Sequence, residues 1–523
     1  MVGTSGATIQ FPDGSTHPIE WVYPDAPACE WVLEREHWPE PLTPMDLWIW
    51  HNGTAGGDRA WDELGLIAPE PFYRFQTAGP FLFFRATPPS PERMAVLAPP
   101  IMKVAQEYGS GYGLWKNFCE RRIIQACEDI AKSTSPGDIR DVAETLFYGF
   151  HQTFTCLSLL FLPSMQLDAM LKEYGVEDAE LTSYELTQGD ENATQDVDAE
   201  IWSLAELARS IPSVASALGP GGHASLDELR RDPPAAPFVR EFDALIERHA
   251  RRSQGWMLTL ETWGERPEAA LALVRAQIAA EHTSPDELRE RSAAARKRAM
   301  DRALAAIPAE RHDEFRRILA RLERYVNVRE GRAYWQLVIV GTMRGYLLRV
   351  GDQLVKDGRI DRADDVYFLT PDDFLGDASD LRGKVASARA EWERWRTIDP
   401  PAVIGTPGGE SAEAAKRREE FRGSPASRGR VTAPVRILHS PEEGTKLQHG
   451  DILVSVMTTP AWTPLFAIAG GIITETGGAL SHPAITAREY GIPAVVALEG
   501  ATKKLKDGQV VTIDGAAGTV TID

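Results

Sequence analysis

The segment GGIITETGGALSHPAITAREYGIPAVVAL, residues 470–498, combines an apolar run, a glycine-rich turn and a short helical pattern. The apolar run predicts a β-strand that ends at Thr474. The residues after it form a tight turn, in which twin glycines let backbone amides approach a ligand closely. A helix is expected from about Ser481. This order places His482 at the start of that helix, directly behind the turn.

His482 is the chemically distinctive side chain of this segment. Free N–H groups and the positive end of the helix dipole would stabilise an anion bound beside it. A neutral imidazole nitrogen is nucleophilic near neutral pH, and a phosphoryl group bound to it is readily passed on. The residues alone leave a second interpretation open, in which His482 is a capping or surface histidine.

Short β-type runs around this segment predict one compact α/β domain at residues 430–523. The runs are DILVSV, GIITET, AVVAL, QVVTID and TVTI, spaced by Gly and Pro and interrupted by one helix. Residues 404–429 are polar and rich in helix breakers, which is typical of a flexible linker. Residues 1–403 are expected to form a mainly helical domain. The expected fold class is therefore α+β with several domains.

Helix signals support the mainly helical first domain. From about residue 98 to 175 the apolar residues follow a helical period. Ser225 with Glu228, and Ser284 with Glu287, have the spacing of capping boxes at helix starts.

The sequence also predicts the secondary structure of three other segments. The segment TIQFPDGSTHPIEWVYP, residues 8–24, has a turn between two β-like runs and predicts a hairpin. The Trp-rich residues 34–57 contain prolines that exclude a long helix, so an ordered loop is expected there. The segment DDVYFLTPDDF, residues 364–374, is expected to be a short strand or turn before one more helix.

The composition indicates a soluble globular protein. The 523 residues are 43% hydrophobic and 25% charged, with a formal net charge of −20 at pH 7. Such an acidic chain repels nucleic-acid phosphates and anionic membranes, so neither is an expected partner. The four cysteines, Cys29, Cys119, Cys127 and Cys156, lack metal-ligand or disulfide-framework spacing. With no signal peptide or bilayer-spanning stretch visible, we expect a cytoplasmic protein without a metal site.

The pattern T-x-G-G-x-x-S-H-x-A-x-x-A-R-E closely resembles the phosphohistidine swivelling domain of phosphoenolpyruvate synthase, pyruvate phosphate dikinase and rifampin phosphotransferase. The residues that match it are Thr476, Gly477, Gly478, Ser481, His482, Ala484, Ala487, Arg488 and Glu489. The resemblance implies that His482 is phosphorylated, and that Thr476, the two glycines and Ser481 shape its pocket. It also implies that Arg488 is a phosphate or structural partner; a helix-surface ion pair is the alternative.

The resemblance extends on both sides of the linker. The segment SPASRGRVTAPVRI, residues 424–437, is similar to the beginning of the swivelling domain, with Arg428 where a proline is common. The acceptor domain of rifampin phosphotransferase is similar in several short pieces that occur in a consistent order. These are HWPEPLTP (37–44), TWGERP (262–267), VREGRAYWQ (328–336), DDVYFLT (364–370) and PAWTPLF (460–466).

The source of the phosphoryl group is expected on another chain. The sequence contains no Gly-rich phosphate loop with the Lys, Glu and Asp of an ATP-grasp domain, and it stops at Asp523, where phosphoenolpyruvate synthase continues into a pyruvate-binding barrel. We therefore expect a separate ATP-grasp subunit that binds ATP and Mg²⁺, no permanent cofactor on this chain, and an acceptor other than pyruvate. This arrangement resembles phenylphosphate synthase and related alkylphenol-phosphorylating enzymes, which implies a small phenolic acceptor.

Aromatic side chains are candidates for the acceptor pocket. They are Trp31, Trp38, Trp48, Trp50 and Trp335. Packing in a hydrophobic core is the alternative for each of them.

Transfer to a hydroxyl requires a base and positive charge near the phosphoryl oxygens. Arg329, Glu330 and Arg332 are candidate charge partners, because helical spacing places 329 and 332 on one face. A solvated helix face is the alternative. His51 and His151 are candidate bases, and a buried structural histidine is the alternative for each.

These observations predict a phosphohistidine-carrying subunit of an ATP-dependent, dikinase-type phosphotransferase that acts on a small, aromatic hydroxyl compound. Two alternatives stay open. One is a non-catalytic scaffold or regulatory protein that has kept the swivelling fold. The other is transient phosphorylation that drives dehydration of an alcohol.

Overall fold

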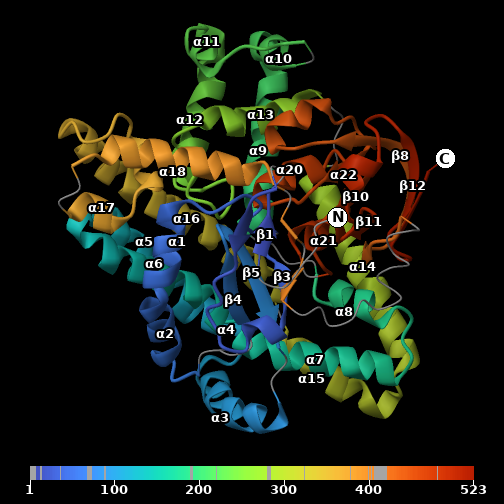
Figure 1. Ribbon diagram of the computed structural model, residues 1–523. Coiled ribbons are helices and arrows are strands. Elements are labelled where there is room, and N and C mark those ends of the chain that lie inside the picture. Colours follow the sequence, from blue (N-terminus) through green and yellow to red (C-terminus); the bar gives the residue numbers. More distant parts are fainter. Residues whose placement is uncertain are drawn as a thin grey trace.

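The computed structural model describes residues 8–522, apart from 12–13, 36, 68–72, 88–89, 189–192, 220, 280–283, 323, 377–378, 399, 402, 406–420 and 480. Helices make up most of the molecule, and a mixed sheet forms the C-terminal domain (Figure 1). The chain therefore has the α+β, multidomain architecture predicted from its sequence.

The C-terminal domain is built on a seven-stranded sheet with the order β13-β12-β8-β9-β10-β11-β7. The strands are β7 (Ser424–Ser427), β8 (Arg430–Ile437), β9 (Ile452–Ser455), β10 (Gly471–Thr474), β11 (Ala494–Val496), β12 (Val510–Asp514) and β13 (Thr519–Ile522). Strands β8, β9, β10 and β11 are parallel, and the outer pairs are antiparallel. The central strands are buried throughout, which explains their continuous apolar sequences. Each predicted β-type run is a strand of this sheet.

Helix α21 (His482–Tyr490) connects β10 to β11, as the sequence predicts. Shorter helical turns complete this domain: η7 (Pro441–Lys446), η8 (Pro460–Trp462), α20 (Thr463–Phe466) and α22 (Ala501–Lys504).

The larger, helical part is organised around α16 (Tyr325–Lys356), a helix of 32 residues. Helix α16 packs against α5, α6 and α9, so its middle is surrounded by other helices. The other helices of this part are α3 (Pro91–Tyr108), α4 (Gly111–Leu114), α5 (Glu120–Lys132), α6 (Ile139–Thr155), α7 (Ser158–Glu173), α8 (Ala179–Leu186), α9 (Ala193–Ser210), α10 (Pro212–Leu218), α11 (Leu226–Arg230), α12 (Ala236–His249), α13 (Pro267–Ala279), α14 (Pro285–Ala306), α15 (His312–Arg321), α17 (Pro371–Leu375) and α18 (Leu381–Arg396). The short helical turns η2 (Trp115–Cys119), η3 (Pro136–Asp138), η4 (Pro233–Ala235) and η5 (Ala309–Arg311) join some of them.

Both predicted capping boxes are confirmed. Ser225 accepts a hydrogen bond from the Glu228 N–H at the start of α11, and Ser284 accepts one from the Glu287 N–H at the start of α14. In each case the glutamate carboxylate accepts a hydrogen bond from the N–H of the serine, which satisfies two helix-end groups at once.

A second, antiparallel sheet has the order β4-β5-β3-β6. Its strands are β3 (Glu30–Leu33), β4 (Tyr73–Ala78), β5 (Phe81–Ala86) and β6 (Val403–Gly405). The predicted hairpin is confirmed by the antiparallel pair β1 (Thr8–Gln10) and β2 (Thr16–Pro18), and η1 (Ala26–Ala28) follows it.

The loop predicted for residues 34–57 is wrong in its second half, where α1 (Pro44–Asn52) begins and α2 (Thr54–Asp62) follows. Thr43 accepts a hydrogen bond from the Asp46 N–H, and the Asp46 carboxylate accepts one from the Thr43 N–H. Pro44 occupies the first helical position, where a missing N–H costs nothing. The prolines therefore precede the helix and do not interrupt it.

The segment predicted as the linker begins and ends in strands. Its first residues belong to β6, which pairs with β3, and β7 near its end pairs with β11. Residues 406–420 of that segment lie outside the described residues. The segment 364–374, predicted as a short strand or turn, is not a strand: it contains most of the short helical turn η6 (Ala363–Phe368) and most of α17.

One helical stretch, Pro136–Glu173, is long and apolar enough by composition to cross a membrane, with a mean hydropathy of 1.4. It contains α6 and α7. Helix α6 packs against α2, α5 and α16, and Leu146 and Phe147 belong to the main core. Burial in this core accounts for part of the apolar composition, whereas Phe161 and Met165 of α7 are exposed.

Candidate active site

Backbone geometry fixes His482 at the first position of α21. Thr476 is tied to the Val456 carbonyl, to which its N–H and its hydroxyl both donate at 3.1 Å. Gly477 has a φ of +102°, and a Cβ at this position would lie 2.6 Å from Ser481 Oγ. A glycine is therefore required for the turn to close.

Ser481 and Gly478 complete the turn. Ser481 is the N-cap residue of α21, but its hydroxyl donates to the Gly478 carbonyl at 2.7 Å and does not cap the helix. A Cβ on Gly478 would meet nothing within 4 Å among the described residues. The structure thus combines the predicted turn residues in one loop beside His482.

Three threonine hydroxyls surround the imidazole of His482. Thr458 Oγ1 lies 3.3 Å from Nδ1, whereas Thr463 Oγ1 and Thr486 Oγ1 each lie 3.2 Å from Nε2. The Thr463 hydroxyl also donates to the Pro460 carbonyl at 3.0 Å. Because a hydroxyl has one proton, Thr463 then accepts from an N–H at Nε2. This arrangement favours the tautomer with a lone pair on Nδ1.

His482 is half-buried, and its ring lies at the edge of the Phe466 ring, with 5.9 Å between the centroids. Burial, followed by the charge of Arg252, lowers the pKa of His482 to about 3. The imidazole is therefore neutral at physiological pH, which is the form that can attack phosphorus.

The loop that carries Thr458 and Thr463 is docked on the helical part. Arg252, which follows α12, donates to the Pro460 carbonyl at 2.9 Å. The Thr459 hydroxyl donates to the carbonyl of Gln254 at 3.2 Å. Helix α20 of the same loop contacts α9 and α13 (Figure 1). In this conformation His482 faces the helical part.

The last turn of α21 makes a second set of contacts with α9. The Tyr490 hydroxyl donates to the Asp198 carboxylate at 2.5 Å, and the Gln277 amide donates to the same group at 3.2 Å. Gln195 donates to the Glu489 carboxylate at 2.7 Å. Burial raises the pKa of Asp198 to about 6, although both of its hydrogen bonds act in the opposite direction. The docked interface therefore contains buried polar groups.

Arg488 is buried and has a structural role in this conformation. Its guanidinium donates to the carbonyls of Ala426 and Ala479, each at 2.7 Å, and lies 4.5 Å from the centroid of the Tyr184 ring in α8. Burial, followed by the charge of Arg329, lowers the pKa of Arg488 to about 10. The structure thus places Arg488 as a support for the turn rather than in a surface ion pair.

Arg428, where a proline is common in the resembling domains, also joins the two parts of the molecule. Its Nε lies 3.0 Å from the Glu185 carboxylate, and the guanidinium also pairs with Asp178. Both acids belong to α8 or the residue before it, so this departure from the pattern supplies docking contacts.

The predicted charge partners lie at the start of α16. Glu330 is 4% exposed, and the guanidinium of Arg332 lies 5.2 Å from the centroid of the Phe154 ring. Arg332 Nε has no hydrogen-bond partner among the described residues. Burial, followed by the charge of Arg329, lowers the pKa of Arg332. The charge of Arg329 lowers the pKa of both Arg332 and Arg488. Because Arg488 belongs to α21, this cluster lies beside the C-terminal domain.

The two predicted bases lie outside the contacts of His482. His51 is exposed, and its Nδ1 lies 2.7 Å from the Leu47 carbonyl of its own helix. His151 Nδ1 accepts a hydrogen bond from the Trp61 indole at 3.2 Å, and burial lowers the pKa of His151 to about 4. These contacts fit the structural interpretation of His151.

Trp31 does not belong with the other candidate pocket residues. It is fully buried in β3 and stacks on Tyr23, with 5.7 Å between ring centroids, in the core of the N-terminal sheet. The other four tryptophans are half-buried and pack at the edge of the main helical core: Trp38, Trp48, Trp50 and Trp335. Among them, Trp50 lies 5.2 Å from Trp38 and 5.4 Å from Phe147, between ring centroids.

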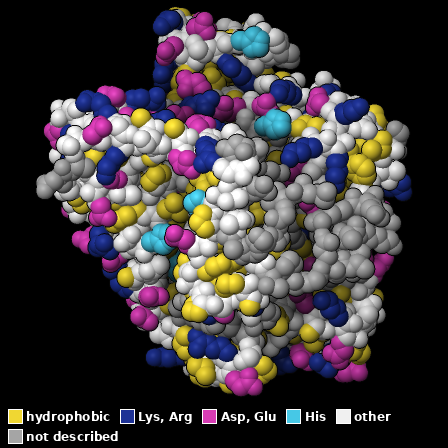
Figure 2. Space-filling model, in the orientation of Figure 1, with side chains coloured by type: hydrophobic (Ala, Val, Ile, Leu, Met, Phe, Trp, Pro, Cys, Tyr) yellow, Lys and Arg dark blue, Asp and Glu magenta, His cyan; other side chains and the backbone are white. Residues whose placement is uncertain are grey.

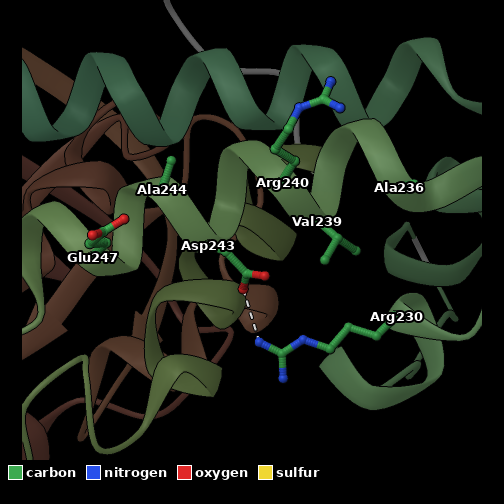
Figure 3. Close-up of a pocket in the computed structure, with 7 residues that line it drawn as sticks. All are labelled: Arg230, Ala236, Val239, Arg240, Asp243, Ala244 and Glu247. Carbon is green, nitrogen blue, oxygen red and sulfur yellow. Dashed lines mark hydrogen bonds and ion pairs between the residues drawn. The ribbon is translucent and has the colours of Figure 1, made fainter.

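A surface groove on α11 and α12 is drawn in Figure 3. It has a volume of about 540 Å³ and is lined by Arg230, Ala236, Val239, Arg240, Asp243, Ala244 and Glu247. An ion pair of 2.9 Å joins Arg230 to Asp243 (Figure 3). Helix α11 lies at the top of Figure 1, well away from α21, so this groove is separate from the site of His482.

The charged side chains on the face in Figure 2 are mixed in sign, with no large region of one charge. Within the described ranges, no group of three or more His, Cys, Asp or Glu side chains is arranged to hold a metal ion.

Four residues of the site were not identified from the sequence: Arg252, Thr458, Thr463 and Thr486. Thr486 lies one helical turn after His482 in the glycine-turn motif, and Thr463 lies in the segment PAWTPLF, so both had a local signal. Arg252 had none, because folding brings it to His482 from a distant part of the chain.

Two family models match this chain. "PEP-utilising enzyme, mobile domain" matches residues 447–518, and "Rifampicin phosphotransferase fourth domain" matches residues 153–330. The first range contains His482, and the second contains Arg252 and Asp198. The two matched regions therefore meet at the docked interface.

Several curated proteins are similar over longer stretches. Chondramide synthase cmdD of Chondromyces crocatus is 25% identical over 97% of this chain and 14% of its own length. The uncharacterized phosphotransferase YvkC of Bacillus subtilis is 28% identical over 71% of this chain and 47% of its own length. A rifampicin phosphotransferase of a Streptomyces species is 31% identical over 63% of this chain and 40% of its own length.

The matched region thus spans less than half the length of each of these relatives. The chain carries the mobile domain of the PEP-utilising enzymes and is related to phosphotransferases of the rifampicin phosphotransferase type.

Proposed function

We propose that this chain carries the phosphohistidine of an ATP-dependent, dikinase-type phosphotransferase. In this proposal an ATP-grasp subunit binds ATP and Mg²⁺ and charges His482. The C-terminal domain then delivers the phosphoryl group to a hydroxyl compound held by the helical part. One observation carries the proposal: a neutral, half-buried His482 is docked against the region that is similar to a rifampicin phosphotransferase domain.

The docked conformation fits the second step of such a reaction, the transfer from His482 to the acceptor. His482 faces the helical part here, so a nucleotide-binding subunit reaches it only after the C-terminal domain has moved away. Many of the contacts that hold this domain are polar, including the hydrogen bond from Arg252 to Pro460 and that from Tyr490 to Asp198. The same interface also contains a shared apolar core, in which Leu465 and Phe466 cluster with Val274 of α13. Movement of the domain therefore has to separate apolar as well as polar contacts.

We further propose a small aromatic hydroxyl compound as the acceptor. The support for this comes from the half-buried aromatic side chains around Trp50, which lies 5.4 Å from Phe147 between ring centroids. Another aromatic residue of the same helix, Phe154, lies under the guanidinium of Arg332. Aromatic surfaces bind aromatic ligands well, and an arginine beside them offers a donor to a hydroxyl or phosphoryl oxygen.

The proposal is tested by incubating the chain with a candidate ATP-grasp subunit and with ATP labelled at the β or γ phosphate. We expect a label on the wild-type chain that survives mild alkali and is lost in acid, as phosphohistidine behaves. His482→Ala should abolish the label. His449→Ala is the matched control, because His449 is an exposed histidine of the same domain.

A His482→Ala chain that is labelled as strongly as the wild type, or that supports the same product formation, refutes the proposal. A wild-type chain that stays unlabelled indicates the scaffold alternative. Mass spectrometry of the product then separates the two catalytic alternatives, because dehydration leaves no phosphate on the product.

A further inference from the structure

Arg252 is a buried cation at the docked interface without a carboxylate partner. Its side chain is 2% exposed, and its Nε has no hydrogen-bond partner in the part of the chain that the structure describes. No carboxylate of the described residues forms an ion pair with it; the guanidinium lies over the Trp263 ring, 4.9 Å from the centroid. Burying a cation without a counter-charge is costly. The guanidinium can therefore take up an anionic group as a direct partner at low cost.

A short chain of hydrogen bonds connects Arg252 to the reactive ring. The guanidinium and the Thr463 hydroxyl both donate to the Pro460 carbonyl, at 2.9 Å and 3.0 Å. Thr463 Oγ1 lies 3.2 Å from His482 Nε2. The guanidinium is therefore held near the imidazole by the loop of the C-terminal domain itself.

Electrostatics agree with this geometry. The charge of Arg252 contributes, after burial, to the lowered pKa of His482, so the two groups act on each other. Burial lowers the pKa of Arg252 to about 10, and the guanidinium remains charged at physiological pH. The Tyr334 hydroxyl and, after it, the Glu330 carboxylate act against burial and raise the pKa of Arg252.

We propose that Arg252 binds the phosphoryl group on His482 and is a catalytic residue of its transfer, so that docking depends on whether His482 is phosphorylated. This inference rests on the proposed function. A phosphoryl group brings a charge of about −2 and additional acceptor oxygens, which can form the direct ion pair that Arg252 lacks among the described residues. The phosphorylated domain then docks preferentially, and the discharged domain is released.

The transfer step balances without a further reactant. The bond between phosphorus and the imidazole nitrogen breaks, its electron pair returns to the ring, and the acceptor oxygen forms a new bond to phosphorus. The proton that the acceptor hydroxyl loses balances the N–H that the neutral imidazole regains. Arg252 exchanges no proton. It stabilises the negative charge on the phosphoryl oxygens as the bond to nitrogen lengthens.

The experiment uses Arg252→Gln and Arg252→Lys in the full chain, with Arg349→Gln as the matched control. Arg349 is a half-buried arginine of α16 whose hydrogen bonds stay within the helical part, to the carbonyls of Ile130, Ala131 and Ser133. Potassium phosphoramidate, a small phosphoryl donor for histidine, is the probe. Docking is followed as deuterium uptake of Pro460–Phe466, the segment covered by the helical part.

We expect phosphorylation to slow deuterium uptake of this segment in the wild type and in Arg349→Gln, but not in Arg252→Gln. Arg252→Lys should retain part of the response, since lysine keeps the charge but not the planar fork of donors. In the complex with the ATP-grasp subunit, Arg252→Gln should reduce product formation about 100-fold, the typical effect of removing one such donor, while His482 is charged at the wild-type rate.

The inference is wrong if Arg252→Gln responds to phosphorylation like the wild type, or if it forms product at the wild-type rate. These outcomes are distinct from failure of the proposed function, in which the wild-type His482 would accept no label from either donor. A thermal unfolding curve for each variant identifies any that fails to fold, and Arg252→Lys then carries the test.

Discussion

The hydrogen bond from Tyr490 to Asp198 links the C-terminal domain to α9, and Tyr490→Phe removes only the hydroxyl. The phenol is 2% exposed and donates to the carboxylate at 2.5 Å. Phenylalanine keeps the aromatic contact with Phe466, whose ring centroid lies 6.1 Å away. The substitution therefore isolates one interdomain hydrogen bond with little change in packing.

The expected loss can be worked out from the surroundings of Asp198. At mildly alkaline pH this carboxyl is ionised, because its pKa is raised only to about 6. A hydrogen bond to a charged acceptor contributes about 2 kcal/mol, and its loss leaves the buried carboxylate with the Gln277 amide as its remaining donor. We expect the docking equilibrium to shift roughly 30-fold toward the undocked state.

Deuterium uptake of Pro460–Phe466 measures this shift, because docking covers that segment. The coupling is obtained from a double-mutant cycle with Asp198→Ala. If Tyr490→Phe increases uptake equally in the wild type and in Asp198→Ala, the effect does not pass through this hydrogen bond and the reasoning is refuted.

Two further predictions concern the turn and the pH response. Gly477→Ala forces a residue with a Cβ into a φ of +102° and places that Cβ within 2.6 Å of Ser481 Oγ. It should lower the free energy of unfolding by about 1 to 3 kcal/mol and slow the labelling of His482. Gly478→Ala, whose Cβ would meet nothing within 4 Å, should behave like the wild type in thermal unfolding and labelling; equal effects of the two substitutions would contradict the assigned geometry. The raised pKa of Asp198 means that the folded state binds its proton more tightly than the unfolded state. The free energy of unfolding of the wild type relative to Asp198→Asn should therefore fall, by up to about 3 kcal/mol, as the pH rises from 3.8 to about 6, and stay constant above that; a flat difference would exclude the shift.

The C-terminal domain was predictable because its signals are local. Parallel strands buried on both faces require continuous apolar runs, and the turn before His482 requires glycine at a positive φ. Each of these requirements is met within a few residues of sequence. Strands β9 to β13, the helix from His482 and the position of the histidine could therefore be predicted from local sequence, whereas β7 and β8 were not predicted as strands.

The helical side of the site could not be predicted in the same way. Apolar periodicity shows that a residue is buried but not against which core, so Trp31 could not be separated from Trp50, which packs elsewhere. The prediction of a loop at residues 34–57 was wrong for a different reason. In sequence, a proline at the first helical position cannot be told from a proline that interrupts a helix. Arg252 is brought to His482 by tertiary packing alone, and no spacing rule identifies such a contact.

Buried polar groups at the interface give a physical reason for reversible docking. An interface built only from apolar side chains would hold the C-terminal domain permanently, because apolar burial is favourable whatever the state of His482. Beside the shared apolar core, Arg252 and Asp198 bring a cost into the docked state, one as a buried cation with no ion pair among the described residues and the other as a carboxyl with a raised pKa. A phosphoryl group on His482 would remove the first cost and leave the second unchanged. The balance between them would then change with each cycle of charging and transfer, which is the condition for a domain that must bind at one site and leave for another.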